Sequence, residues 1–482
     1  NTSFLGTLPD SIGTLENLTR VDLRSYNFTR PIPTSMANLA QLFHMDFSSN
    51  HFSGPIPSLH KSRNLNYLDL SSNNLNEIHL LSNNQFENQF PEISNMSSSF
   101  SKLRLASSKP WVIPILKNQS QLSFFYISNN QISGEIPNWI WEVGGVNLYF
   151  LNLSQNLLVS LQEPYHISGR TYSFSTINKS LIGFIPEYIC KATYFQVLDL
   201  SNNNLSGSIP ACLITKSSTT LGVLNLRRNN LGVVLKSLAN CNMLQVLDLR
   251  NNHISDNFPC WLRNAFSLQV LVFRSNNFSE RISCPRNNVS WPLLKIVDLA
   301  SNKFSGRLSQ KWLLTMMIIQ LKIPNIFTSI DCSSNNFEGP MPEEMGRFKS
   351  LYAPNMSHNA LKGSIPSSFG NLKQIESLDL LMNNLMGKIP TSTQLQSFLP
   401  TSYEGNKGLY IPPLTNDIQT HPPESQPLPP PASSNEIDWF FIAISIGFAV
   451  SFGAVVSPLM FFVHVKKWYN DLIYKFIYRR FR

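Results

Sequence analysis

The stretch of sequence that decides the fold is Phe195-Gln-Val-Leu-Asp-Leu-Ser-Asn-Asn-Asn-Leu-Ser-Gly-Ser-Ile-Pro210. Leu198 and Leu200 alternate with polar residues, which is the pattern of a short strand with one buried face. Asn203 ends that strand, and the glycine and proline that follow bend the chain toward a further copy. Almost everything before residue 390 repeats this stretch imperfectly, as L-x-x-L-x-L-x-x-N-x-L-x-G-x-I-P. One copy cannot bury its leucines alone, so the pattern predicts a stack of coils.

The asparagine at position 203 serves as the anchor of each copy. The same asparagine recurs along the chain, at Asn50, Asn73, Asn84, Asn130, Asn156, Asn229, Asn252, Asn276, Asn302, Asn335, Asn359 and Asn383, and weaker copies carry Tyr26, Ser108 and Lys179 instead. These 16 anchors lie about 24 residues apart on average, a period typical of leucine-rich repeats with a parallel sheet. The sequence therefore predicts an α/β solenoid, a leucine-rich-repeat horseshoe of about 16 coils over residues 1–390.

Two places depart from this period. Asn73 and Asn84 are only 11 residues apart, which suggests a local deletion that joins two partial coils. A short apolar insert occupies about residues 308–326, and it is too short to span a bilayer. The sequence also begins inside a copy, at Asn1, so we expect it to be incomplete at its N-terminal side.

The segments after the repeat have different compositions. Residues 391–415 leave the repeat and are expected to cap the last coil. Residues 416–438 are rich in proline and end in acidic side chains, which favours an extended spacer. Residues 439–463 contain no charged side chain and are long enough for a tilted transmembrane helix. The basic segment 464–482 follows at once, so the positive-inside preference places it in the cytoplasm.

The predicted transmembrane helix also carries small residues at four-residue spacing. They form two stripes, Ala443, Gly447 and Ser451, and Ala449, Gly453 and Ser457. Such stripes allow another helix to approach closely, although small residues are common in any membrane helix. A buried helix of a soluble domain is the alternative for this segment.

Cysteines and glycosylation sequons both point to an extracellular chain. Cys260 and Cys284 each lie eight residues after an anchor in consecutive coils, so their separation suits a disulfide; two unpaired thiols are the alternative. Cys190 and Cys212 form a weaker pair, and Cys332 is expected in the core. Eleven N-x-[ST] sequons occur, at Asn1, Asn17, Asn27, Asn95, Asn118, Asn152, Asn178, Asn204, Asn277, Asn288 and Asn355. With a membrane anchor, they favour a glycoprotein of the secretory pathway.

A cluster of arginines marks the most informative surface. The position two before the anchor is usually serine, but three consecutive coils carry Arg227, Arg250 and Arg274 there, with Arg228 beside the first. Like charges stacked at about 5 Å repel each other and need compensation. Either Asp248 pairs with them on the same face, or guanidinium groups grip an anionic or carboxylate-bearing ligand.

The sequons indicate where on the sheet such a ligand would bind. Asn152, Asn178 and Asn355 fall on strands of the predicted concave face, and glycans there would block those parts of the arc. The strands that end between Asn203 and Asn335 carry no such sequon, so a ligand surface is expected in this window.

The charge and the motifs exclude several classes of function. The net charge is +9, but residues 466–482 contribute +5 of it, so the charge is not a nucleic-acid signal. The sequence contains no phosphate-binding loop, zinc-ligand spacing or nucleophile elbow. We therefore expect neither catalysis nor a metal or cofactor, and a signal received outside would need a partner protein inside.

Several longer motifs match a known family. They are Leu224-Asn-Leu-Arg-Arg-Asn-Asn-Leu231, Phe258-Pro-Cys-Trp-Leu262, Ile330-Asp-Cys-Ser-Ser-Asn-Asn-Phe-Glu-Gly339, Ser357-His-Asn-Ala-Leu361, Gly387-Lys-Ile-Pro-Thr-Ser-Thr-Gln-Leu-Gln-Ser-Phe398 and Glu404-Gly-Asn-Lys-Gly-Leu409. With the acidic, membrane and basic segments at the end, the chain resembles the plant leucine-rich-repeat receptor-like proteins, kinase-less receptors of the disease-resistance type. The chain departs from the family at Tyr410-Ile411, where Cys-Gly is frequent, and in its short insert near residue 315.

The resemblance implies a single-pass type I protein of the plasma membrane, with its N-terminal side outside the cell. Such a receptor would bind an extracellular peptide, protein or glycan, often derived from a pathogen. Its helix and acidic outer segment would associate with a receptor kinase. Three alternatives stay open: a developmental co-receptor for peptide hormones, an extracellular inhibitor of a secreted hydrolase, and a non-functional truncated paralogue.

Overall fold

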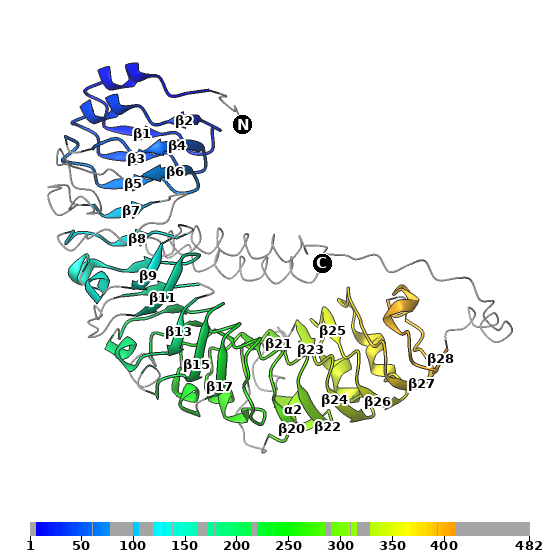
Figure 1. Ribbon diagram of the computed structural model, residues 1–482. Helices are drawn as coiled ribbons and strands as arrows, with labels where there is room; N and C mark the ends of the chain where they lie inside the picture. Colours follow the sequence, from blue (N-terminus) through cyan, green and yellow to red (C-terminus); the bar gives the residue numbers. More distant parts are fainter. Residues whose placement is uncertain are drawn as a thin grey trace, which may run out of the picture. The chain divides into compact units, whose positions relative to one another are not determined.

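The computed structural model describes residues 6–410, apart from residues 60, 78–99, 106–118, 129, 131, 137, 142, 162–170, 178–179, 192, 212, 214–218, 235, 285–290, 309, 316–327 and 393. Asn1–Leu409 form one compact unit in which coil follows coil along the chain (Figure 1). The predicted leucine-rich-repeat solenoid is confirmed. The predicted segments 416–438, 439–463 and 464–482 lie outside the described residues, as do both stripes of small residues. In the described part, no helix has the length and apolar character needed to cross a membrane.

The main element is a 14-stranded parallel sheet in which each short strand comes from a different coil. Its strands, in order, are β1 (Arg20–Asp22), β3 (His44–Asp46), β5 (Tyr67–Asp69), β7 (Lys102–Arg104), β8 (Phe124–Tyr126), β10 (Phe150–Asn152), β12 (Ser173–Ser175), β14 (Val197–Asp199), β16 (Val223–Asn225), β18 (Val246–Asp248), β19 (Val270–Val272), β21 (Ile296–Asp298), β23 (Ser329–Asp331) and β25 (Ala353–Asn355). We call it the large sheet. The middle residue of each strand is buried in the stack, and Leu224 and Leu247 have no exposed surface.

Smaller parallel sheets form where each coil passes the Gly-x-Ile-Pro segment. They contain β2 (Thr29–Pro31), β4 (His51–Pro55) and β6 (Asn74–Glu77); β9 (Ser133–Ile136) and β11 (Leu157–Leu161); β13 (Ile182–Phe184), β15 (Asn204–Ser208) and β17 (Asn230–Val233); and β20 (Ser279–Arg281), β22 (Lys303–Arg307), β24 (Asn336–Gly339), β26 (Ala360–Gly363), β27 (Asn384–Lys388) and β28 (Gly408–Tyr410). We call these the side sheets.

The helical parts of the coils are mostly single 3₁₀ turns. They are η1 (Asp10–Thr14), η2 (Thr34–Asn38), η4 (Asn138–Trp141), η5 (Gly145–Asn147), η6 (Glu187–Lys191), η7 (Lys236–Asn240), η8 (Cys260–Asn264), η9 (Glu343–Arg347), η10 (Ser367–Asn371) and η11 (Pro400–Ser402). The short α-helix α2 (Gln310–Thr315) lies in the predicted insert. The predicted α/β solenoid is thus refined in one respect: the helical parts described are mostly 3₁₀ turns and not α-helices. A coil of about 24 residues leaves room for little more than one tight turn besides its strands.

The anchor asparagines hold neighbouring coils together through buried hydrogen bonds. Asn252 donates from Nδ2 to the carbonyl oxygens of Leu249 and Leu226, at 2.9 and 3.0 Å, and its Oδ1 accepts from the Leu231 N–H at 3.0 Å. The same pattern recurs at Asn50, Asn73, Asn156, Asn203, Asn229, Asn276, Asn302, Asn335, Asn359 and Asn383. Each amide therefore satisfies backbone groups that the strand ends leave without a partner.

The structure corrects the number of coils in one place. Tyr67 of β5 pairs directly with Lys102 of β7, so these two strands are neighbours in the large sheet, and the anchor predicted at Asn84 lies outside the described residues. The asparagine and leucine spacing alone indicated a coil there, but 11 residues are too few to make a strand and return to the sheet.

The segment expected to cap the last coil carries a further anchor-like asparagine. Asn406 behaves as a further anchor, because its Nδ2 donates to the Leu380 oxygen at 2.9 Å and its Oδ1 accepts from the Leu385 N–H at 3.0 Å. Tyr403 takes the buried position three residues earlier, and its hydroxyl donates to the Leu395 oxygen at 2.7 Å. The first part of the segment predicted as a cap, residues 391–410, therefore completes one more coil.

Candidate functional site

The exposed side of the large sheet is lined by the residues that alternate with the buried ones. Four residues before the anchor stands an acidic residue in many coils, and its Oδ1 accepts from the N–H two residues later. Asp69 accepts from Ser71 N at 3.1 Å in this way, and Asp331 accepts from Ser333 N at 3.0 Å. Short acidic side chains often satisfy their own turn like this. The second carboxylate oxygen remains available to side chains of the neighbouring coil.

The predicted arginines use these acidic residues. Arg250 places Nε 3.2 Å from Asp248 Oδ2. Arg274 places Nε 2.9 Å from Asp298 Oδ2 and pairs through Nη2 with Asp331. The structure therefore brings Asp248 and Arg250 together, which is what the intramolecular alternative predicts. Aspartates of the chain compensate the charges of Arg250 and Arg274.

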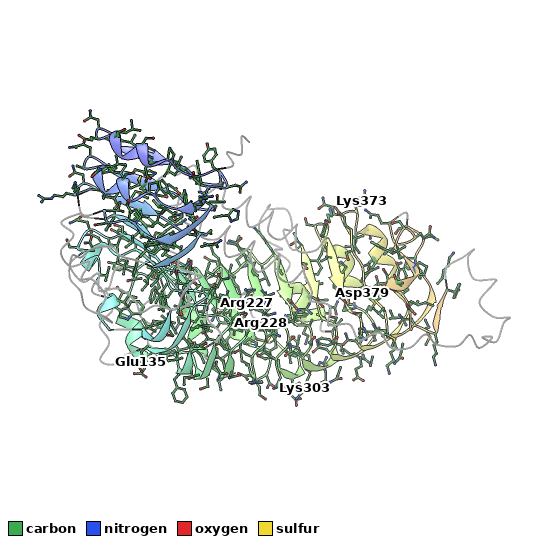
Figure 2. All side chains as sticks on the ribbon, turned by 45° about the horizontal axis from the view of Figure 1, so that its top comes forward. Glu135, Arg227, Arg228, Lys303, Lys373 and Asp379 are labelled. Atoms are coloured by element: carbon green, nitrogen blue, oxygen red, sulfur yellow. A yellow bond between two sulfur atoms is a disulfide. The ribbon has the colours of Figure 1, made fainter. Side chains whose placement is uncertain are left out.

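Arg227 and Arg228 have different surroundings from the other two arginines. Burial lowers the pKa of Arg227, and the positive charge of Arg250 lowers it further. Arg228 is exposed, with its backbone in the left-handed region at φ 53°, and its Nη1 donates to Asn202 Oδ1 at 3.4 Å. Figure 2 shows Arg227 and Arg228 next to each other on the central coils. This part of the face, which carries two adjacent arginines, is the candidate ligand surface.

Reasoning from the sequence missed Asp298 and Asp331. Both stand four residues before an anchor, Asn302 and Asn335, as Asp248 does before Asn252. Asp298 of β21 and Asp331 of β23 lie opposite each other in the strand register. Burial raises the pKa of Asp298 to about 6. Extending the search from one aspartate to every residue at this position would have found them.

A second polar cluster lies on β3 to β8, outside the predicted window. The ring of Tyr67 stacks on His44 with centroids 4.1 Å apart, and Lys102 Nζ lies 4.6 Å from the centre of the same ring. Arg104 lies over Tyr126 at 4.3 Å and pairs with Asp69 at 3.3 Å. We call this group, from His44 to Tyr126, the aromatic–basic cluster.

Burial has a strong effect on the lysine of this cluster. It lowers the pKa of Lys102 to about 8, and the charge of the neighbouring Arg104 acts in the same direction. The Lys102 amine lies 3.2 Å from the Tyr67 hydroxyl, whose own pKa is raised by burial and by the nearby Asp69.

One group of side chains in the described part has the composition of a metal site. Asp22, His44 and Asp46 bring ligand atoms within 4.8 Å of one another. Asp22 is already paired with Arg24 at 2.6 Å, and Asp46 accepts from the Ser48 hydroxyl at 2.6 Å. Arg24 and the Ser48 hydroxyl therefore already bind these carboxylates. The group is better explained by hydrogen bonds and ion pairs within the sheet face than by a metal site.

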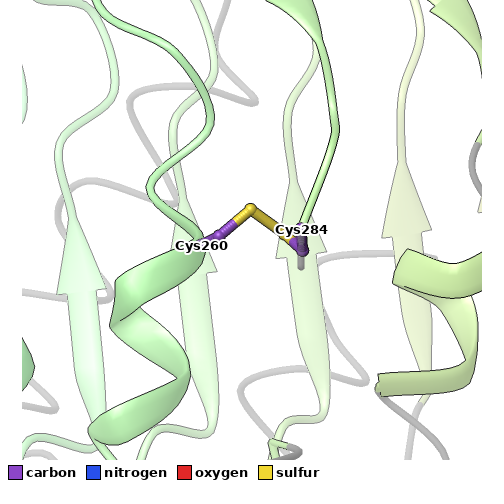
Figure 3. The surroundings of a disulfide bond; sticks show 2 residues. All are labelled: Cys260 and Cys284. Carbon is purple, nitrogen blue, oxygen red and sulfur yellow. A yellow bond between two sulfur atoms is a disulfide. The ribbon is translucent and has the colours of Figure 1, made fainter. Parts of the chain in front are cut away.

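The cysteines lie where neighbouring coils meet. Cys260, at the start of η8, and Cys284, after β20, form a disulfide with their Cα atoms 5.3 Å apart (Figure 3). Cys190 is also disulfide-bonded, and its expected partner Cys212 lies outside the described residues. Cys332 is buried and unpaired in the core, as is Cys241.

The predicted glycosylation sites divide into three groups. Those with exposed side chains are Asn17, Asn27 and Asn204. Those with half-buried side chains are Asn152, Asn277 and Asn355, of which Asn152 and Asn355 lie in strands of the large sheet. Those outside the described residues are Asn1, Asn95, Asn118, Asn178 and Asn288.

Comparison with known proteins agrees with this fold. The Leucine Rich Repeat family model matches residues 121–143, 194–215 and 243–265. Receptor-like protein 35 of Arabidopsis thaliana is 28% identical over 306 residues, which cover 49% of this chain and 31% of that protein. Receptor-like protein 53 of the same plant is 30% identical over 294 residues, which cover 49% of this chain and 30% of that protein. The chain thus spans about a third of the length of the curated relatives it matches.

A solved structure shows the same fold. It is the crystal structure of the Arabidopsis receptor kinase HAESA in complex with the peptide hormone IDA and the co-receptor SERK1, with a TM-score of 0.59 and 23% sequence identity. The match covers 85% of this chain and 68% of that chain. The repeats and the fold are those of a leucine-rich-repeat protein, and the relatives that the chain resembles over about half of its length are plant receptor-like proteins.

Proposed function

We propose that this chain is the ligand-sensing subunit of a receptor at the plant cell surface, and that it signals in defence through a partner receptor kinase. The observation that carries the proposal is the face of the large sheet, a parallel ladder from β1 to β25 with charged side chains on adjacent central coils. Such a surface can bind a ligand across several coils. The likeness to Arabidopsis receptor-like proteins supports a receptor role.

The signalling part of the proposal depends on residues 439–463. We expect the full chain, purified from plant membranes, to bring a receptor kinase with it, and a chain without this segment to bring none. A sharper variant changes Ala443, Gly447 and Ser451 to Leu. It keeps the segment apolar but removes the small stripe that would admit a partner helix. Recovery of no receptor kinase with any of the three chains would refute the signalling role.

A second candidate is a co-receptor for a peptide with a free C-terminal carboxylate. It is favoured by the exposed guanidinium group of Arg228, which lies beside Arg227 on the central coils and donates to Asn202 Oδ1 at 3.4 Å (Figure 2). The HAESA structure, which has the same fold, contains a peptide hormone. A guanidinium pair would bind a carboxylate with geometry that a lysine cannot supply.

The test compares free and amidated C-termini in one library of synthetic peptides. We expect free-acid peptides to bind the full chain and Arg228→Glu to abolish that binding, because the new carboxylate would repel that of the peptide. Arg228 is exposed, and its reversal breaks no ion pair within the described residues. Lys303→Glu is the matched control, since Lys303 is exposed at the start of β22, on a side sheet (Figure 2). Equal binding by both variants would remove the arginines from the ligand site.

A further inference from the structure

An apolar patch stands on the side sheets, away from the face described above. It consists of Leu157 and Val159 on β11 and of Ile182 and Phe184 on the next coil, in β13. Phe184 is 72% exposed, Ile182 59% and Leu157 51%. Apolar side chains that gather in this way on a surface usually have something to cover them.

The patch breaks a pattern that most other coils keep. The residues on either side of the Gly in Gly-x-Ile-Pro point outward and are mostly polar or proline, as in Ser53 and Pro55, Ser133 and Glu135, Ser206 and Ser208, Ser305 and Arg307, and Lys362 and Ser364, with Met386 an exception. At Gly183 the flanking residues are Ile182 and Phe184. Other coils fold with polar residues beside the same glycine, so the fold does not require apolar side chains at Ile182 and Phe184.

A sequon lies beside the patch in the same sheet. Asn204 and Ser206 of β15 are the register partners of Ile182 and Phe184 of β13. Leu205 between them is buried, so Asn204 and Ser206 point outward on the same face as the apolar pair. Adjacent parallel strands lie about 4.8 Å apart, roughly the width of one sugar ring.

The side chain of Asn204 is exposed and suitably oriented. Its Oδ1 accepts from Asn230 Nδ2 on the opposite side, in β17, so the carboxamide nitrogen is directed away from β17. Phe184 is held by the following coil: a Cβ added to Gly207, at φ 75°, would meet the ring at 2.6 Å. The Phe184 ring therefore lies against β15, the strand that also carries Asn204.

We propose that Asn204 is N-glycosylated and that its first sugar residues pack on Ile182 and Phe184, covering the apolar patch. The less polar face of an acetylated sugar suits an aromatic ring, and the covalent link to the neighbouring strand supplies the sugar at high effective concentration. The inference rests on the extracellular placement in the proposed function and on neither the ligand nor the kinase.

The experiment uses the full chain, produced in plant cells behind an added secretory leader. Peptide mass spectrometry measures the occupancy of Asn204, and hydroxyl-radical footprinting measures the reactivity of Ile182 and Phe184. We expect Asn204 to be glycosylated, and Asn204→Gln and Ser206→Ala each to raise Phe184 reactivity about twofold, as expected when one ring face is uncovered. Ser206→Thr keeps the sequon and should restore both the glycan and the protection.

Two controls separate shielding from a change in the fold. Asn277→Gln removes a different sequon and should leave Phe184 unchanged. Leu399, 71% exposed near the C-terminal end of the repeat, should react equally in all variants. Unmodified Asn204 in a chain whose Asn17 and Asn27 carry glycans would overturn the inference and leave the proposed function standing. Glycosylated Asn204 with unchanged Phe184 reactivity would also overturn it, and would leave the patch to a partner protein.

Discussion

The coil anchored at Asn252 and the coil anchored at Asn130 share one motif but differ in their hydrogen bonds. Asn252 uses both ends of its amide, whereas Asn130 donates to the oxygens of Leu105 and Ile127 and its Oδ1 has no hydrogen-bond partner in the described residues. In each regular coil the donor to this oxygen is the residue two after the preceding anchor. For Asn130 that residue is Pro110, and proline has no N–H.

The comparison shows that a repeat can keep its consensus letters and lose part of its stabilisation. The asparagine is present in both coils, but the bond it makes depends on a residue about 20 positions earlier in the sequence. The coils near residues 100–180 match the repeat less well than the central ones, and a missing donor is one physical reason for this difference.

Replacing the anchors would break this comparison most directly. Asn252→Ala leaves two carbonyls and one N–H without partners inside the stack, and we expect a loss of about 3 kcal/mol in local stability. Asn130→Ala should cost about 1 kcal/mol less, because one of the three bonds is absent already. Amide hydrogen exchange of β16 to β19 and of β8 to β10 measures both. Equal losses would contradict the interpretation, and exposed His253→Ala serves as a control within about 0.5 kcal/mol.

The two regions also differ in how they compensate charge on the sheet face. In the central coils, Arg274 forms ion pairs with Asp298 and Asp331. In the aromatic–basic cluster, the cations lie over tyrosine rings as well as near carboxylates. Arg274→Ala would leave two carboxylates facing each other across adjacent strands. Allowing for the partial exposure of the arginine, we expect the free energy of local unfolding to fall by about 2 kcal/mol, as measured by hydrogen exchange of the β19 to β23 amides. Adding Asp298→Asn should recover most of it, and a double variant no more stable than the single one would count against the bridge.

The pH dependence of the central coils follows from Asp298. Burial raises its pKa to about 6 against an ordinary value of 3.8, so between these values the folded chain holds a proton that the unfolded chain has released. This group therefore makes the central coils less stable as the pH rises from about 4 to 6, with a constant penalty above. Asp298→Asn should remove this slope from amide exchange at β21. A slope that persists in the variant would assign the effect to another group.

The smallest expected effect concerns the basic residue of the other region. Because burial lowers the pKa of Lys102 from the ordinary lysine value of 10.5 to about 8, its acetylation rate should rise with a midpoint near pH 8. Arg104→Met should move the midpoint upward, since the Arg104 charge contributes to the lowering. Quantitative peptide mass spectrometry gives the profiles of the unchanged chain and of the variant, and a Lys102 midpoint near 10.5 in the unchanged chain would show that its amine is solvated normally.

Several features of the fold and the face follow from local sequence. The leucines of the strand and the anchor asparagine recur with a fixed period, so the coil and its buried face can be predicted without coordinates. The pairing of Arg250 with Asp248 is also local, because the two residues are on one strand face two positions apart. By contrast, Asn406 was missed because its motif carries Tyr403 in place of the usual leucine, although the two fill the same buried position.

By itself, the sequence determined that this protein is a leucine-rich-repeat stack with an asparagine in each coil, because that pattern serves contacts within a coil and with its immediate neighbour. Only the tertiary structure decided that β5 pairs directly with β7, that Arg274 reaches Asp331 and that Asn204 lies beside Ile182. The reason is that a loop of any length can separate two coils in the sequence. Stacking then brings side chains together according to strand register, which the spacing between repeats does not record.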